Sequence, residues 1–141
     1  MPEVRVAQTD AEIASCGPVL RELRPHIAEN DLVARVRRQE QTGYRLAMLE
    51  EDGIVQAVAG FRIHENLASG RMLYVDDLVT RAEARSRGYG AALLAWLVDL
   101  ARQEHCDNLE LDSGHQRHAA HRFYLAQRMS IVSHHFRLPL R

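Results

Sequence analysis

One stretch of the chain, from Tyr74 to Arg102, limits the choice of fold more than any other. Residues 74–80 are rich in aromatic and branched side chains, which is typical of a largely buried strand. A glycine-containing loop follows at residues 85–90. From Ala91 to Arg102 the apolar residues then fall on one wide helical face. The sequence therefore predicts a strand, a loop and a helix in immediate succession.

The loop places Gly88 and Gly90 directly before this helix. Because glycine has no Cβ, the backbone can come close to a ligand at these positions. The free N–H groups of the first helical turn point outward, with the positive end of the helix dipole behind them. This arrangement predicts an anion site, most naturally one for phosphate.

Two common phosphate-binding motifs are excluded. A nucleotide P-loop, G-x-x-x-x-G-K followed by Ser or Thr, needs a lysine, and the chain contains none. A dinucleotide-binding loop needs three glycines spaced as G-x-G-x-x-G, and Gly88 and Gly90 are not followed by a third. The motif that remains has the form R-x-x-G-x-G and starts at Arg85.

This motif, preceded by Asp-Asp-Leu-Val-Thr at residues 76–80 and followed by an apolar helix, resembles the pyrophosphate loop of the GNAT N-acetyltransferases. Members of that family bind acetyl-coenzyme A. The resemblance implies that acetyl-coenzyme A is the co-substrate of this chain and that the loop holds its pyrophosphate.

Composition sets the other limits. At 141 residues the chain has the size of a single domain, here 1–141, that can bury a core. No apolar run approaches 18 residues, and the first five residues lack the pattern of a signal peptide, so we expect neither a membrane span nor secretion. A net charge of −1 argues against non-specific nucleic-acid binding. Cys16 and Cys106, far apart in sequence, fit reduced cytoplasmic thiols better than a disulfide framework.

Local patterns predict the remaining elements. A Thr9–Glu12 capping box starts a helix that Gly17-Pro18 disturbs and Arg24-Pro25 ends. Asn30 caps a second helix that runs through Gln41. Asp52-Gly53 is a hairpin signal between two strands. The predicted strands are residues 3–7, 44–50, 54–64, 74–80, 108–112 and 130–138, and the last helix is 117–128.

The resulting order, β-α-α-β-β-β-α-β-α-β, matches the GNAT fold. This is an α/β (α+β) fold with a mixed, mostly antiparallel sheet and helices on both faces. In the family, the strand before the glycine loop carries a bulge and pairs with the pantetheine arm. The resemblance implies that the cofactor-binding residues are Leu78, Val79, Thr80, Arg85, Ser86, Arg87, Gly88, Tyr89, Gly90, Ala91, Ser113 and Arg117.

Family helices of the kind expected at residues 117–124 often read N-x-x-A-x-x-(Leu or Phe)-Tyr. Ala120, Phe123 and Tyr124 match this pattern, whereas Arg117 replaces the asparagine. The usual Gly-Phe after the helix is also missing, with Met129-Ser130 in its place. The resemblance implies that Tyr124 is the general acid that serves the departing thiolate. A tyrosine that packs beside Phe123 without a catalytic role is the alternative.

Transfer to an amine also needs a base, because an alkylammonium with a pKa near 10.4 is almost entirely protonated at neutral pH. Asp76 and Asp77 are the candidates, since they lie just before the residues expected to line the thioester. Adjacent strand residues point to opposite faces, so ordinarily only one of the two can serve, although a bulge near Leu78 can blur this alternation. An arginine partner such as Arg62 or Arg71 is the structural alternative for either carboxylate.

Two functions therefore stay open. The first is an N-acetyltransferase for a primary amine of a small molecule or a protein; the second is a non-catalytic acyl-coenzyme A sensor. His115, His118 and His121 recur every third residue, but no cysteine or H-E-x-x-H pattern accompanies them, so we expect no metal site. His121 remains an alternative base. The family resemblance also suggests a homodimer through the C-terminal strand, while the acceptor stays unspecified.

Overall fold

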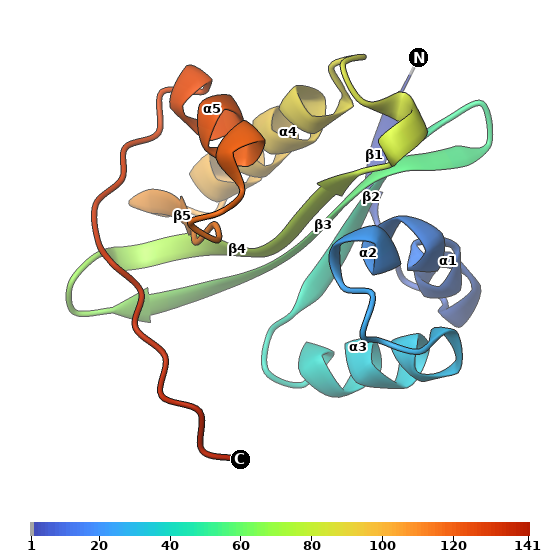
Figure 1. Ribbon diagram of the computed structural model, residues 1–141, viewed down its shortest axis with the longest axis horizontal. Helices are drawn as coiled ribbons and strands as arrows, with labels where there is room; N and C mark the ends of the chain where they lie inside the picture. Colours follow the sequence, from blue (N-terminus) through green and yellow to red (C-terminus); the bar gives the residue numbers. More distant parts are fainter. Residues whose placement is uncertain (1) are drawn as a thin grey trace. The chain divides into compact units, whose positions relative to one another are not determined.

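The computed structural model describes residues 2–141, and Figure 1 shows its elements. The strands are β1 (Glu3–Val6), β2 (Arg45–Glu51), β3 (Ile54–Asn66), β4 (Gly70–Thr80) and β5 (Asn108–Leu111). The helices are α1 (Asp10–Ser15), α2 (Gly17–Leu23), α3 (Leu32–Glu40), α4 (Tyr89–Gln103) and α5 (His118–Ala126), with short 3-10 turns at Glu29–Asp31 and Ala82–Ala84. The chain divides into two compact units, one ending at Glu110 and one running from Leu111 to Arg141.

The sheet has the order β1-β2-β3-β4-β5, and β1 to β4 pair antiparallel with their sequence neighbours. The β2–β3 hairpin turns at Asp52 and Gly53, whose φ values of 58° and 72° are those of a tight hairpin turn. This pair was the hairpin signal in the sequence. The fold class expected from the sequence, a mostly antiparallel sheet with helices on both faces, is confirmed.

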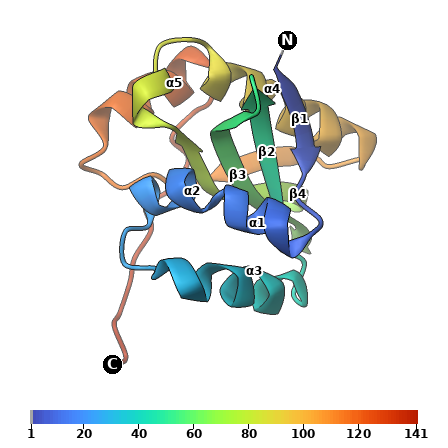
Figure 2. The ribbon, with the colours of Figure 1, turned by 90° about the vertical axis from the view of Figure 1, so that its right-hand side faces the viewer.

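Helices cover both faces of the sheet (Figures 1 and 2). On one face α1, α2 and α3 bury a common core with the strands, which includes Ile13, Leu20, Leu32, Val36, Leu46, Met48 and Val58. On the other face lies α4, where Trp96 meets the edge of Phe61 of β3, with ring centroids 6.3 Å apart. No helix within residues 2–141 is long and apolar enough to cross a membrane.

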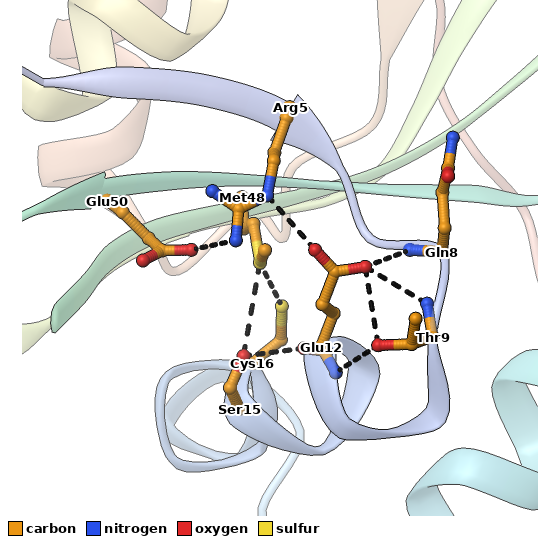
Figure 3. A network of polar contacts seen from close by, with 8 residues as sticks. All are labelled: Arg5, Gln8, Thr9, Glu12, Ser15, Cys16, Met48 and Glu50. Carbon is orange, nitrogen blue, oxygen red and sulfur yellow. Dashed lines mark hydrogen bonds and ion pairs between the residues drawn. The ribbon is translucent and has the colours of Figure 1, made fainter. Parts of the chain in front are cut away.

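The start of α1 shows how closely local sequence sets local structure (Figure 3). Thr9 Oγ1 accepts from the Glu12 amide at 3.1 Å, and Glu12 Oε1 accepts from the amides of Thr9 and Gln8, each at 3.0 Å. The guanidinium of Arg5 forms ion pairs with both Glu12 and Glu50 of β2. The two backbone amides, with Arg5 next, lower the pKa of Glu12 to about 2. The capping box predicted from the sequence is therefore present.

Several boundaries differ from those expected. The disturbance at Gly17-Pro18 is a full break, since Cys16 separates α1 from α2. Asn30 is not a helix cap: it lies within the 3-10 turn that precedes α3. The central strand β4 begins at Gly70, four residues before Tyr74, and α4 begins at Tyr89 rather than at Ala91.

The expected last strand, residues 130–138, is wrong. Residues 130–141 form neither helix nor strand. Phe136, Leu138 and Leu140 alternate as strand residues do, yet their exposed fractions are 91%, 81% and 89%. A strand needs a neighbour to receive its backbone hydrogen bonds, and no strand of residues 2–141 pairs with this segment. The element order within the described residues therefore ends with α5.

Candidate functional site

The glycine loop lies between β4 and α4 and contains two residues with positive φ. Ser86 has φ 68°, and Gly88, the N-cap of α4, has φ 83°. This left-handed backbone suits glycine and turns the chain sharply into the helix. A Cβ placed on Gly88 would meet no atom within 4 Å, so the space above the loop is open.

The first turn of α4 provides backbone donors for an anion. Its amides have no partner inside the helix, as at any helix N-terminus, and the glycine N-cap has no side chain that could accept from them. No acidic residue lies in this turn. Arg85 and Arg87 are exposed beside it. Donors, dipole and cations thus fit the pyrophosphate of coenzyme A at the place that the sequence predicts.

Two carboxylates anchor this loop from neighbouring elements. Glu22 of α2 accepts from the Ala82 amide at 2.9 Å, and its Oε1 lies 4.0 Å from a guanidinium nitrogen of Arg85. The hydroxyl of Tyr89 donates to Glu51 of β2 at 3.3 Å, and the Tyr89 ring is buried. Tyr89 therefore fixes the start of α4 to the sheet.

The end of β4 keeps one backbone edge without a strand. Leu78, Val79 and Thr80 pair with Ala59, Val58 and Ala57 of β3. On the other side, β5 starts beside the beginning of β4, where the Asp107 amide donates to the carbonyl of Arg71. A four-residue strand extends only about 10–13 Å, so a strand that starts beside Arg71 does not reach the partner positions of residues 78–80. In the described part of the chain, β5 therefore leaves residues 78–80 open to an extended ligand.

A bulge in β4 places the two candidate carboxylates on one side of the sheet. Gly60 of β3 pairs with Asp77, whereas the next residue, Phe61, pairs with Val75. Asp76 is therefore the extra residue, and the strict alternation of side chains fails at this point. Both carboxylates contact residues that come from the face covered by α1, α2 and α3. The expected bulge is present, two residues before Leu78.

Asp77 is held at both oxygens. Arg24, at the end of α2, donates through Nε to Oδ1 at 2.8 Å, and the hydroxyl of Tyr44 donates to Oδ2 at 2.8 Å. Burial, with the charge of Asp77 next, raises the pKa of Tyr44, so its hydroxyl stays protonated and acts as a donor. A Cβ at Gly60 would lie 1.8 Å from that hydroxyl. Glycine is thus needed here to make room for the pair.

Asp76 is held at one oxygen. Arg62 of β3 donates from Nε to Oδ2 at 2.8 Å, and its other nitrogens donate to Thr42 and Gln39. Within residues 2–141 no group donates to Oδ1 of Asp76. Arg62 is one of the two arginine partners named from the sequence. The other, Arg71, instead donates to the carbonyl of Glu104.

The C-terminal unit contains the remaining predicted residues. Tyr124 lies on α5, with its ring 5.4 Å from that of Phe123. Burial raises the pKa of its hydroxyl, and the guanidinium of Arg117, the N-cap of α5, opposes this rise. The Ser113 hydroxyl is buried and has no hydrogen-bond partner within the described residues. His121 Nε2 lies 2.7 Å from the carbonyl of Gly114.

Three residues beside the carboxylates could not be found from sequence motifs. Arg24 lies 53 positions before Asp77, Tyr44 lies 33 positions before it, and Gly60 reads as an ordinary strand glycine. The strand context of Gly60 was the one available signal, because glycine inside a strand often marks a bulge or a close approach.

The histidines do not form a cluster of the kind that holds a metal. His118 and His121 stack edge to face at 5.9 Å, and His135 Nδ1 lies 3.2 Å from Asp112. Across residues 2–141, no three His, Cys, Asp or Glu side chains are grouped as metal ligands would be.

Comparisons with known proteins show which family has this sequence and fold. The family model described as Acetyltransferase (GNAT) family matches residues 11–129. The uncharacterized N-acetyltransferase YhdJ of Bacillus subtilis is 36% identical over 134 residues, 92% of each chain. Aminoalkylphosphonate N-acetyltransferase of Salmonella typhimurium is 33% identical over 96 residues, 67% of this chain and 59% of that protein. Aminoglycoside N-acetyltransferase AAC(6')-Iy in complex with CoA gives a TM-score of 0.86 at 13% identity, over 100% of this chain and 95% of that one.

The similarity in sequence extends well beyond the glycine loop, since the family model covers both the carboxylates of β4 and the tyrosine of α5. The donor of the family is acetyl-coenzyme A, and the loop at α4 offers the backbone donors that its pyrophosphate needs. The chain therefore belongs to the GNAT family and is an acetyl-coenzyme A-dependent N-acetyltransferase.

Proposed function

We propose that the chain transfers the acetyl group of acetyl-coenzyme A to a primary amine of a small molecule or protein, with Asp76 as base and Tyr124 as general acid. The observation that carries this proposal is the bulge of β4. It places the half-buried carboxylate of Asp76 two residues before the open strand edge at residues 78–80, and the phosphate loop follows further along the chain.

The donor would be held by two sets of backbone groups. The amides from Arg85 to Ala91 would bind the pyrophosphate, each bond to an anionic oxygen contributing about 1.5–3 kcal/mol. The open edge at Leu78, Val79 and Thr80 would pair with the pantetheine arm as an added strand. Ser113 and Arg117 complete the set that we assign to the donor. The unpaired hydroxyl of Ser113 supports this assignment, because a buried hydroxyl without a partner is costly.

When bound, acetyl-coenzyme A supplies a thioester whose carbonyl carbon the amine nitrogen attacks. The C–N bond forms, the C–S bond breaks, the ammonium proton goes to a base and the thiolate takes up a proton. Only about one alkylamine in a few thousand is neutral at pH 7, so the base contributes directly to the rate.

Asp76 suits the role of base better than Asp77. Both oxygens of Asp77 already accept hydrogen bonds, and its side chain is 14% exposed. Asp76 is 26% exposed and is held at Oδ2 by Arg62, so its Oδ1 is oriented and available. We therefore assign Asp77 to the scaffold and Asp76 to proton removal, directly or through water.

Tyr124 suits the role of acid because its hydroxyl is protonated at neutral pH. An unperturbed tyrosine has a pKa of about 10, and burial on α5 raises the pKa of Tyr124. It can therefore deliver a proton to a thiolate that leaves nearby.

The test is release of free thiol from acetyl-coenzyme A with spermidine, benzylamine and 2-aminoethylphosphonate as acceptors. The last is included because one relative is named for aminoalkylphosphonates. Turnover with any of them supports transfer, whereas coenzyme A binding without turnover on a broad amine panel would favour the sensor function.

The role of the base is tested by a variant. Asp76→Asn should lose rate at neutral pH and recover as pH approaches the pKa of the amine. Asp77→Asn changes a carboxylate of the scaffold and should lose less rate at neutral pH than Asp76→Asn does. A pH profile for Asp76→Asn that equals wild type would refute the assignment.

Three further expectations belong to this proposal. We propose that residues 1–141 act as one catalytic domain, which the family match across the boundary at Glu110 supports.

We propose a homodimer whose interface covers the exposed apolar residues of the C-terminal segment. The substitutions Phe136→Ser and Leu138→Ser would dissociate this dimer, as analytical ultracentrifugation would show. We propose a cytoplasmic location, because Cys16 and Cys106 are both free thiols.

A further inference from the structure

Arg24 connects helix α2 to the bulge of β4 through two hydrogen bonds. Its Nε donates to Oδ1 of Asp77 at 2.8 Å, and its Nη2 donates to the backbone carbonyl of Asp76 at 3.0 Å. One planar guanidinium thus holds the side chain of one bulge residue and the main chain of the other. The residue itself is the C-cap of α2, with φ −122° and ψ 65°, so the helix ends where the contact begins.

The bulge needs such a donor. A bulge inserts a residue that has no partner in the strand ladder, and a carbonyl that is removed from water has to be paired elsewhere. Arg24 supplies the donor for Asp76. On the far side of Asp77, the hydroxyl of Tyr44 donates to Oδ2, and Gly60 leaves the space that this hydroxyl occupies. Asp77 is therefore fixed from two directions, and the backbone beside it is fixed by the same arginine.

We propose that Arg24 is a positioning residue for the acetyl transfer: it fixes the bulge and thereby sets where the carboxylate of Asp76 stands. This inference rests on the proposed role of Asp76 as base. Arg24 itself touches neither the carboxylate of Asp76 nor the reacting groups in this scheme. The planar fork is essential, because an ammonium of lysine is a point charge that cannot hold both acceptors in the same geometry.

The size of the effect follows from the precision that proton transfer needs. A base has to stand within hydrogen-bond distance of the proton that it removes, and a misplacement of about 1 Å costs on the order of 100-fold in rate. We expect Arg24→Lys and Arg24→Ala to lower kcat roughly 10- to 100-fold. Affinity for coenzyme A, measured by calorimetry, should stay within about twofold, because Arg24 donates its hydrogen bonds to the bulge of β4 rather than to the phosphate loop.

The control is Arg21→Ala. Arg21 lies on the same helix one turn earlier, and its Nε donates to the carbonyl of Ile27 at 3.0 Å. Its removal costs a comparable hydrogen bond without touching the bulge, so kcat should stay at the wild-type value. A loss of rate in Arg21→Ala equal to that in Arg24→Ala would show that any damage to α2 suffices, and would overturn the inference.

The decisive experiment combines Arg24→Lys with Asp76→Asn, with 2-aminoethylphosphonate as acceptor, or spermidine if it is the faster substrate. If Arg24 acts through Asp76, the double variant has the kcat of Asp76→Asn alone, and Arg24→Lys alone shows the same recovery of rate at high pH. If the two losses multiply, Arg24 acts elsewhere and the inference fails while the base assignment stands. If Asp76→Asn keeps the wild-type pH profile, the proposed base is wrong and the inference falls with it.

Hydrogen exchange gives an answer that needs no acceptor. In Arg24→Lys, and in Arg24→Ala if it folds, the amides of residues 75–78 should exchange at least tenfold faster than in wild type. The amides of the β2–β3 hairpin should be unchanged, and Arg21→Ala should match wild type throughout. Wild-type exchange at residues 75–78 in the Arg24 variants would show that the arginine does not fix the bulge.

Discussion

Gly60→Ala is the substitution whose cost the structure defines most sharply. A Cβ at this position would lie 1.8 Å from the hydroxyl oxygen of Tyr44, 2.4 Å from its Cζ and 2.7 Å from Oδ2 of Asp77. Real Cβ atoms do not approach other heavy atoms so closely, so the phenol has to move. Tyr44 is only 4% exposed, and its ring has little room in which to do so.

Two losses add up when the ring moves. Overpacking a well-packed site costs about 1–3 kcal/mol, and losing a hydrogen bond to a carboxylate costs about 1.5–3 kcal/mol. When the ring moves away, the overpacking is partly relieved, so the total cost is less than the sum of the two. We therefore expect a destabilisation of about 2–4 kcal/mol. For a chain of this length, that corresponds to a decrease in Tm of about 6–15 °C.

Differential scanning calorimetry of wild type, Gly60→Ala and Gly17→Ala measures this directly. Gly17→Ala is the comparison variant, because its added Cβ meets only one atom within 4 Å, Cδ2 of the Leu32 side chain at 3.2 Å, and lies at the start of a helix. Its Tm should change by no more than about 2 °C. A Tm for Gly60→Ala within 2 °C of wild type would refute the packing of Tyr44 against Asp77 and, with it, the arrangement of the bulge.

Three further predictions concern single side chains. Tyr124→Phe keeps the ring and removes the hydroxyl, so kcat should fall roughly 100-fold with little change in the Kd for acetyl-coenzyme A; an unchanged kcat would make Tyr124 a packing residue. The pKa of Glu12, lowered to about 2 from its ordinary 4.5, means that the group stabilises the fold above pH 4.5 and that this contribution is lost as pH falls towards 2. Glu12→Gln should therefore reduce the dependence of urea midpoints on pH between 4.5 and 2, and a dependence equal to wild type would contradict the capping geometry. Burial raises the pKa of the Cys16 thiol to about 12, so in the native protein at pH 8 iodoacetamide should modify Cys106 and spare Cys16, as peptide mass spectrometry can show.

The features that could be predicted from the sequence are those whose causes are local. The capping box at Thr9, the hairpin at Asp52-Gly53 and the glycine loop before α4 each depend on residues within a few positions of one another. The backbone conformations that these residues favour are the ones found. The conformation of the loop and the start of α4, on which the proposed phosphate site depends, was predictable for the same reason.

The surroundings of the carboxylates could not be predicted, because they depend on contacts between distant residues. Arg24 and Tyr44 reach Asp77 only after the sheet has formed and α2 has packed on it. The position of the bulge at Asp76 follows from pairing with β3, which no local pattern specifies. The last strand failed for a related reason: alternation in residues 136–140 describes what a strand needs on its faces, but says nothing of a neighbouring strand.

The central claim is that the loop before α4 holds the pyrophosphate of coenzyme A. Isothermal titration calorimetry with coenzyme A, on wild type, Gly90→Val and Ala95→Val, tests it most directly. Gly90 is the second residue of α4, and Ala95 is an exposed residue further along the same helix. Valine is a better helix former than glycine, and replacing alanine by valine in a helix costs at most about 0.7 kcal/mol, so neither variant should lose much stability. We predict that Gly90→Val loses at least about tenfold in affinity, the equivalent of one amide–phosphate hydrogen bond, while Ala95→Val binds as wild type does. An unchanged Kd for Gly90→Val would contradict the assignment of this loop to the cofactor.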